Sequence, residues 1–220
     1  MNEGARRNQG GLLRKEKPPD SLPEYMGNAD SNSSRHENDV IGAGGKTFPA
    51  LIKDIKREYN ASFCILLETH ISGDRGRTVC KKLGFDNFYI EDARGFSGGI
   101  WCIWDNSAWN VDITFHSSQM VHMELKQGQS PPWFLSAIYG TPQKASRRAL
   151  WNEIRDLSSN INQPWCLIGD FNAILNDFER KGSIGSNSRG ACSEFQTCIS
   201  DCGLFDLGYC GWLFPGKGVT

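Results

Sequence analysis

Apolar residues at helical spacing stand before two short apolar runs, and this pattern predicts two helix–strand units. The first helix is indicated by apolar side chains three or four positions apart: Phe48, Leu51, Ile52, Ile55 and Tyr59. It leads into the apolar run 63–67. The second helix is indicated in the same way by Ala149, Leu150, Ile154 and Leu157. It leads into the apolar run 164–168.

The middle of the chain has a strand pattern. Four strand-length apolar segments follow one another at regular spacing, at 100–104, 109–115, 120–125 and 133–139. This spacing favours antiparallel pairing of neighbouring segments. A last helix is predicted over 189–202, leading into 204–207. The whole pattern therefore predicts an α+β domain with helices outside its strands.

Each of the two apolar runs ends in a carboxylate. Glu68 follows 63–67, and Asp170 follows 164–168 with Asn172 two residues later. An acid at the end of an apolar strand is costly to bury unless a cation or a donor compensates it, and Mg²⁺ takes one or two carboxylates plus water. The alternatives are a salt bridge at Glu68 and an Asx turn at Asp170. The two motifs together favour a metal and phosphate site, in which the Asn172 amide would contact a phosphate oxygen.

Five short motifs share an order and spacing typical of one group of phosphoesterases. They are Leu66-Leu67-Glu68-Thr69-His70, Ser97-Gly98-Gly99-Ile100-Trp101, Ile138-Tyr139-Gly140-Thr141-Pro142, Gly169-Asp170-Phe171-Asn172 and Phe205-Asp206-Leu207-Gly208-Tyr209. The chain resembles the endonuclease/exonuclease/phosphatase superfamily, whose fold is that of DNase I. It is most similar to the endonuclease domain of plant LINE-type (non-LTR) retrotransposons. The resemblance covers residues 42–211.

The resemblance implies a fold and a set of site residues. The fold would be a DNase I-like four-layer α/β sandwich, with two mixed, largely antiparallel sheets flanked by helices and incomplete at the C-terminus. Glu68 would be the principal metal ligand, with Asp170 as the second. Asp170 and Asn172 would flank the scissile phosphate, and Tyr139 would donate a hydrogen bond to it. The cofactor would be Mg²⁺, with Mn²⁺ as the alternative.

The sequence departs from the family at both ends. Full members end in a Ser-Asp-His motif whose His is the general base, and this chain stops at Thr220 without it. Of the four histidines, His70 is the best substitute by position, although the resemblance gives it no such role. Near the N-terminus, Asp39 stands where the family has an Asn that contacts phosphate. We therefore expect a truncated domain with an incomplete active site.

Three functions follow from these observations. The first is a metal-dependent phosphodiester hydrolase derived from a retrotransposon endonuclease, which nicks DNA through its phosphate backbone and is impaired or inactive. The second is a non-catalytic relic that binds nucleic acid or a protein partner. The third is an AP endonuclease or a phosphatase for small substrates with the same fold.

Composition adds a domain boundary and a compartment. Residues 1–41 hold few large apolar side chains and are expected to form a disordered leader, whereas 42–220 form the partial domain. Hydrophobic residues make up 39% of the chain, which suits a globular domain. No apolar run is longer than a strand, so we expect an intracellular protein, nuclear or cytoplasmic, without a membrane partner.

The net charge limits how the chain can bind DNA, and the positions of the cysteines bear on whether it binds zinc. A formal net charge of −1 excludes a protein that holds DNA by bulk electrostatics and leaves a local basic rim. Its candidates are Arg94, Arg147, Arg148, Arg180, Lys181 and Arg189. Cys64, Cys102 and Cys166 lie in apolar runs and are expected to be core thiols. A zinc site is not favoured, since Cys198 and Cys202 fit successive turns of one helix.

Overall fold

The computed structural model describes residues 42–94, 98–175 and 189–207, and the side chains of 189–192 lie outside this description. Residues 41–205 form one compact unit. Asp39, the predicted leader and residues 208–220 lie outside the described residues. Among the described helices, none combines the length and the apolar character that a membrane span requires.

The unit contains four helices and seven strands in its described residues. In chain order they are α1 (Phe48–Tyr59), β1 (Phe63–Leu67), α2 (Gly73–Cys80), β2 (Asn87–Glu91), β3 (Ile100–Trp104), β4 (Asn110–Ser117), β5 (Met120–Lys126), β6 (Trp133–Tyr139), α3 (Lys144–Ser158), β7 (Trp165–Asp170) and α4 (Arg189–Asp201).

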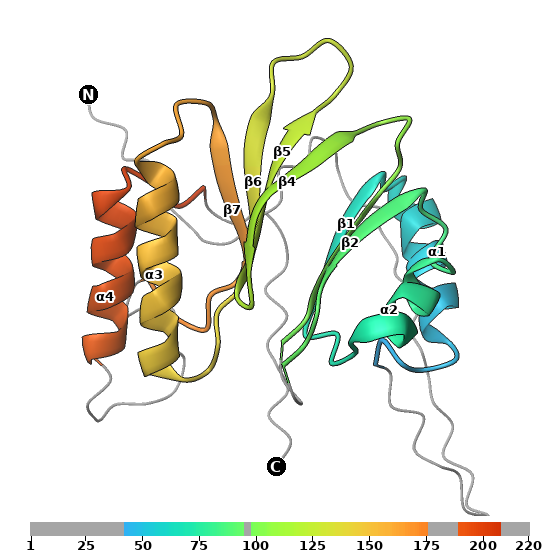
Figure 1. Cartoon of the computed structure of the whole chain (residues 1–220), viewed down its shortest axis with the longest axis horizontal. Helices are drawn as coiled ribbons and strands as arrows, with labels where there is room; N and C mark the ends of the chain where they lie inside the picture. The colour runs from blue at the N-terminus through green and yellow to red at the C-terminus, as the bar shows by residue number, and fades with distance from the viewer. Residues whose placement is uncertain (1–41, 95–97, 176–188, 208–220) are drawn as a thin grey trace, which may run out of the picture. The chain divides into compact units, whose positions relative to one another are not determined.

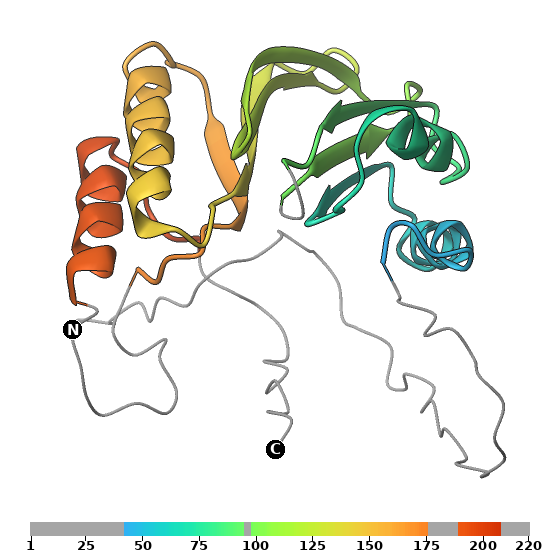
Figure 2. The same ribbon diagram turned by 60° about the horizontal axis from the view of Figure 1, so that its bottom comes forward.

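The strands form two sheets that pack face to face. The first has the order β1-β3-β2 and is antiparallel throughout, and the second has the order β4-β5-β6-β7 with only the β6–β7 pair parallel. Helices α1 and α2 cover the outer face of the first sheet, and α3 and α4 cover the outer face of the second (Figures 1 and 2). The predicted four-layer α+β sandwich is therefore confirmed.

Three apolar clusters separate the four layers. The inner cluster lies between the sheets and includes Ile100, Val121 and Ala137, all fully buried. One outer cluster joins α1 and α2 to the first sheet around Trp101, and the other joins α3 and α4 to the second sheet around Ile154. Successive strand residues alternate between an inner and an outer cluster, as the two-residue period of a strand requires.

Some predicted elements differ from the observed ones. Residues 100–104 form β3, which pairs with β1 and β2 and not with the following strand, so the middle ladder contains β4, β5 and β6 only. The turn after β3 redirects the chain, because the Asp105 N–H bonds to Ser62 O at 2.9 Å and the Trp109 N–H bonds to Asp105 O at 3.0 Å. Residues 204–207 have no regular structure. Elements α2 and β2 carry weak apolar patterns and were not predicted.

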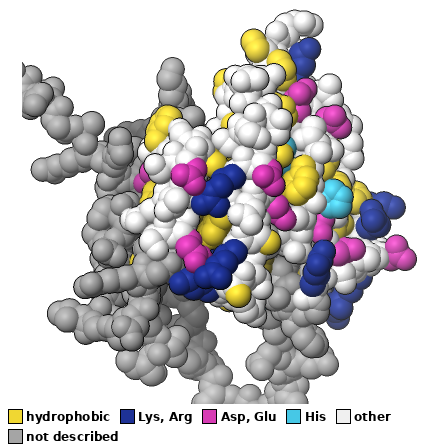
Figure 3. Space-filling model, turned by 60° about the vertical axis from the view of Figure 1, so that its left-hand side comes forward, with side chains coloured by type: hydrophobic (Ala, Val, Ile, Leu, Met, Phe, Trp, Pro, Cys, Tyr) yellow, Lys and Arg dark blue, Asp and Glu magenta, His cyan; other side chains and the backbone are white. Residues whose placement is uncertain are grey.

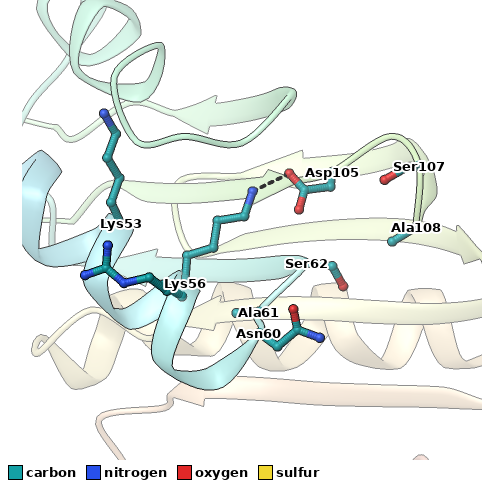
Figure 4. Close-up of a pocket in the computed structure, with 9 residues that line it drawn as sticks. Lys53, Lys56, Asn60, Ala61, Ser62, Asp105, Ser107 and Ala108 are labelled. Atoms are coloured by element: carbon teal, nitrogen blue, oxygen red, sulfur yellow. Dashed lines mark hydrogen bonds and ion pairs between the residues drawn. The ribbon is translucent and has the colours of Figure 1, made fainter.

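The apolar side chains along helix α1 are only partly buried. Ile52 is buried, but Leu51 is 44% exposed and Tyr59 is 51% exposed. Lys56 anchors the helix instead, by donating to Gly84 O at 2.6 Å and to Asp105 Oδ1 at 2.7 Å (Figure 4). The hollow drawn there adjoins Ser62, at the start of β1. Glu68 follows the opposite end of that strand, so this hollow is not the predicted site.

Candidate active site

Glu68 is the first residue after β1, and its backbone is strained. Its φ is +53°, and His70 has a φ of +55°. Positive φ is uncommon for residues other than glycine and costs free energy, so two cases within three residues mark an unusual turn. The Glu68 side chain is exposed. Glu68 is therefore not buried as expected, because its strand ends at the rim of the sandwich, and no cation is needed to offset burial there.

Tyr139 brings the two sheets together at Glu68. It is the last residue of β6, its ring lies in the inner cluster, and it is 3% exposed. Its hydroxyl donates to Glu68 Oε1 at 2.6 Å. Burial raises the pKa of Tyr139 to about 12, helped by the hydrogen bond to Glu68 and the charges of Glu68 and Asp170. The phenol therefore remains a donor at neutral pH, with both carboxylates within electrostatic reach.

Asp170 stands beside Tyr139 because β6 and β7 are parallel and these two residues are register partners. The exposed Asp170 carboxylate accepts the Asn172 N–H at 2.8 Å, which is the Asx turn given above as an alternative. Asn172 has a φ of +46°, and its amide Nδ2 donates to Gly140 O at 2.6 Å. Without substrate, the Asn172 amide is thus held against the loop that follows Tyr139.

Two glycines allow the backbone segments of the site to approach each other closely. Gly99 has a φ of +93°, and a Cβ there would collide with Thr69 Oγ1. Gly169 has a φ of +143°, and a Cβ there would collide with Ile138 O. Thr69 itself is buried, and its hydroxyl has no hydrogen-bond partner among the described residues. Only glycine fits at these two positions.

Gln119 and Arg147 hold the loop after Tyr139, and sequence reasoning missed this role for both. The Tyr139 N–H bonds to Gln119 O at 2.9 Å, and the Thr141 N–H bonds to Gln119 Oε1 at 2.8 Å. Arg147 is buried and donates to Thr141 O and Pro142 O, each at 2.8 Å. Arg147 is therefore not part of an exposed basic rim, which corrects the prediction. A single Gln in a strand turn carries no sequence signal of such a role.

The remaining rim candidates give little support for a basic surface. Arg94 and Arg148 are both exposed. The charge of Arg148 is paired with Glu194 at 2.9 Å. Arg180, Lys181 and the Arg189 side chain lie outside the described residues. Figure 3 shows basic and acidic side chains interleaved over the face that carries α3 and α4. On this face the described residues form no field of one sign.

Of the described histidines, His116 and His122 lie away from Glu68, whereas His70 lies in the same turn. His122 is buried in β5, where its Nδ1 lies 2.7 Å from Ser136 Oγ, and burial lowers its pKa to about 4. His116 in β4 pairs with Glu91. His70 is exposed, and its N–H bonds to Gly98 O at 3.2 Å. His36 lies outside the described residues.

The donor set suits a hard cation bound with water. Within the described part of the chain, no group of three or more His, Cys, Asp and Glu side chains is placed to hold a metal. Glu68 and Asp170 offer two carboxylates beside one phenol, and Mg²⁺ is often bound through one or two carboxylates while it keeps several waters. Six described cysteines are free thiols, and Cys192 and Cys210 lie outside the described side chains.

The fold is similar to that of known nucleases. An AP endonuclease from Leishmania major superposes with a TM-score of 0.58 at 12% identity, covering 74% of this chain and 64% of that one. The endonuclease domain of TRAS1, a telomere-specific non-LTR retrotransposon, superposes with a TM-score of 0.54 at 15% identity, covering 76% and 71%. No protein-family model and no curated protein sequence matches the chain.

These identities show the fold alone, and the fold is DNase I-like. The chain spans less than two thirds of the Leishmania enzyme. Glu68 and Tyr139 come from facing sheets and are hydrogen-bonded, and Asp170 is the register partner of Tyr139. Two carboxylates, a phenol donor and a carboxamide thus gather at one end of the sandwich.

Proposed function

We propose that this domain is a metal-dependent phosphodiester hydrolase related to retrotransposon endonucleases, and that its substrate is DNA. The observation that carries the proposal is the 2.6 Å hydrogen bond from Tyr139 to Glu68, which joins the two sheets beside Asp170. Two acids beside a neutral donor support this proposal, because the hydrolysis of an anionic ester with a bound cation uses such groups. The fold of the two nucleases agrees with it.

Each site residue has a distinct part in the proposed reaction. Glu68 and Asp170 would hold Mg²⁺ or Mn²⁺, which when bound would neutralise charge on the phosphate. Tyr139 would turn its hydroxyl from Glu68 to a phosphate oxygen, and its protonated state at neutral pH suits a donor. The Asn172 amide would exchange Gly140 O for another phosphate oxygen. Asp170 would orient the attacking water.

We further propose that hydrolysis by this chain is impaired, so that nicking is slow. A positioned general base contributes roughly 10²–10⁴-fold to such reactions. Among the described histidines, His122 is buried in β5, where it contacts Ser136, and His116 is bonded to Glu91. His70 is the remaining candidate for the general base among the described histidines, and it lies two residues after Glu68 in the strained turn.

The decisive experiment is the nicking of supercoiled plasmid by the purified chain with Mg²⁺ or EDTA. Glu68→Gln and Asp170→Asn should abolish any Mg²⁺-dependent nicking, because each keeps the shape of the side chain and removes its charge. Glu58→Gln is the matched control, since Glu58 is exposed on α1 and takes no part in the site. Nicking that survives both site substitutions would come from a contaminant or another site, and the proposal would fail.

Two alternatives predict different results from the same variants. A non-catalytic relic would show no nicking in any variant while Mg²⁺ titration still distinguished the native chain from Glu68→Gln. An AP endonuclease would cleave an abasic duplex in strong preference to an intact one. A phosphatase would release phosphate from small esters and leave plasmid intact.

A further inference from the structure

A second contact between the two sheets lies at the same end as Glu68 and Tyr139. His116 in β4 places Nδ1 2.8 Å from Glu91 Oε2 in β2. The ring of Tyr89, also from β2, lies 5.7 Å from the His116 ring, centroid to centroid. The sandwich is thus bridged twice at this end, once by Tyr139 with Glu68 and once by His116 with Glu91.

The register of the strands gives the spacing between the two bridges. In the first sheet, Glu91 is the register partner of Ile100, which is in turn the partner of Leu67. Glu91 therefore lies two strands from β1, at the level of the residue before Glu68. In the second sheet, His116 is the register partner of Val121, which is in turn the partner of Ala137. His116 therefore lies two strands from β6, at the level of the residue two positions before Tyr139. At about 4.8 Å between strands, both sheets place the bridges roughly 10 Å apart.

The His116 bridge is built to present one nitrogen. The Glu91 side chain is only 13% exposed, whereas His116 is 58% exposed. The carboxylate occupies Nδ1, so Nε2 is the nitrogen that a ligand can reach. A carboxylate at Nδ1 fixes the orientation of the ring, so that the exposed Nε2 is the atom that meets a ligand. The titratable groups that contact the ring among the described residues are Glu91 and Tyr89.

We propose that His116 binds a backbone phosphate of a polynucleotide, one or two nucleotides from the phosphate held at Tyr139. This inference rests on the proposed function and specifies its substrate. The rise of about 3.4 Å per nucleotide in duplex DNA is measured along the helix axis. Because the backbone also winds around that axis, neighbouring phosphates of one strand lie about 7 Å apart, and a separation of roughly 10 Å corresponds to one or two nucleotides. A small phosphoester at Tyr139 cannot reach His116. The second contact therefore selects a polymer.

Binding of a fluorescent 20-base-pair duplex in EDTA tests this contact without any need for catalysis. His116→Gln is expected to weaken binding at pH 6 by roughly two- to fivefold, the size of an exposed ionic contact. It should also lower the slope of log K against log salt by about one. His116→Lys, which keeps a donor at this position, should restore binding.

Lys126→Gln is the matched control, because it removes one exposed positive charge at the opposite end of the second sheet. The inference is overturned if His116→Gln behaves like Lys126→Gln in affinity and salt slope. The proposed function would still stand after that result if Glu68→Gln abolishes the Mg²⁺-dependent nicking. If the native chain shows no duplex binding at low salt and no nicking, both proposals fail together. Because His116 is exposed, its variants should remain folded, which circular dichroism checks.

Discussion

Backbone strain is concentrated in the residues that form the candidate site. Four described residues other than glycine have positive φ, and three of them are Glu68, His70 and Asn172. The fourth, Asn60, is the left-handed C-cap of α1, an ordinary place for such a residue. Strain of this kind persists only where surrounding contacts enforce it, and here the enforcing contacts come from Gly98, Gly140 and Thr69.

Gly99 should be far less tolerant of a side chain than another glycine with a similar backbone. We expect Gly99→Ala to cost about 2–4 kcal/mol, because positive φ is unfavourable for Ala and the new methyl would displace the Thr69 hydroxyl. Gly128 also has a positive φ but has no atom within 4 Å of an added Cβ. Gly128→Ala should cost only about 1 kcal/mol.

Urea unfolding of the two glycine variants measures the difference. Equal losses of stability would show that Thr69 yields freely, and the close approach of β3 to the turn after Glu68 would then carry no constraint.

At the scale of elements, a buried polar network joins three strands of the second sheet. The Trp165 indole N–H in β7 donates to Ser136 Oγ in β6 at 2.9 Å, and Ser136 contacts His122 in β5. The His122 ring also stacks on Phe134, with centroids 5.0 Å apart. His122 is 2% exposed and Ser136 is fully buried, so both are shielded from water, and burial lowers the pKa of His122 to about 4.

This network should make stability depend on pH. The folded-state pKa of His122 is about 4, below the unfolded value of 6.5, so the folded chain binds fewer protons between these values. The contribution of His122 to the free energy of unfolding is fully present above pH 6.5. It falls by up to about 3 kcal/mol as the pH drops to 4. His122→Gln should remove this part of the pH dependence in urea unfolding. The exposed His116→Gln should retain it, and equal curves for both variants would contradict the assignment.

Sequence patterns anticipated the elements that contain apolar runs and missed those that do not. Strands β1 and β7 were expected because a run of five apolar residues stands before each of Glu68 and Asp170. Helix α2 was not, because its residues are mainly glycine, charged residues and threonine. Its position is fixed by tertiary contacts, including the Gly73 N–H bond to Asp92 Oδ1 at 2.9 Å.

The same reasoning holds for the site. Glu68, Tyr139, Asp170 and Asn172 were proposed from motifs, and the structure brings them to one end of the sandwich. The roles assigned to them in catalysis remain predictions. Gln119, Arg147 and the His116–Glu91 pair could not be predicted, since each depends on contacts between residues that are distant in sequence or differ little from ordinary surface residues.

At the scale of the whole molecule, both strands that lead into the site lie at the edge of a sheet. Among the described residues, β1 pairs only with β3 and β7 only with β6. Their residues 63–67 and 165–168 are half-buried and apolar. Unpaired apolar edges are templates for pairing with other chains.

We therefore expect the purified 220-residue chain to self-associate as its concentration rises. Light scattering and size-exclusion chromatography over a concentration series measure this, and thermal unfolding should be broad or irreversible. A monomer at every concentration, with a sharp and reversible transition, would contradict the expectation.

The division of strands between the sheets has one more consequence. Strands β1 to β3 with α1 and α2 precede Asp105, and β4 to β7 with α3 and α4 follow Trp109, so no strand crosses from one half to the other. The exposed Ser107 marks the junction. Glu68 belongs to the first half, whereas Tyr139, Asp170 and Asn172 belong to the second. The chain can thus be divided at Ser107 into two fragments, neither of which contains the whole site, and the site would report their reassembly.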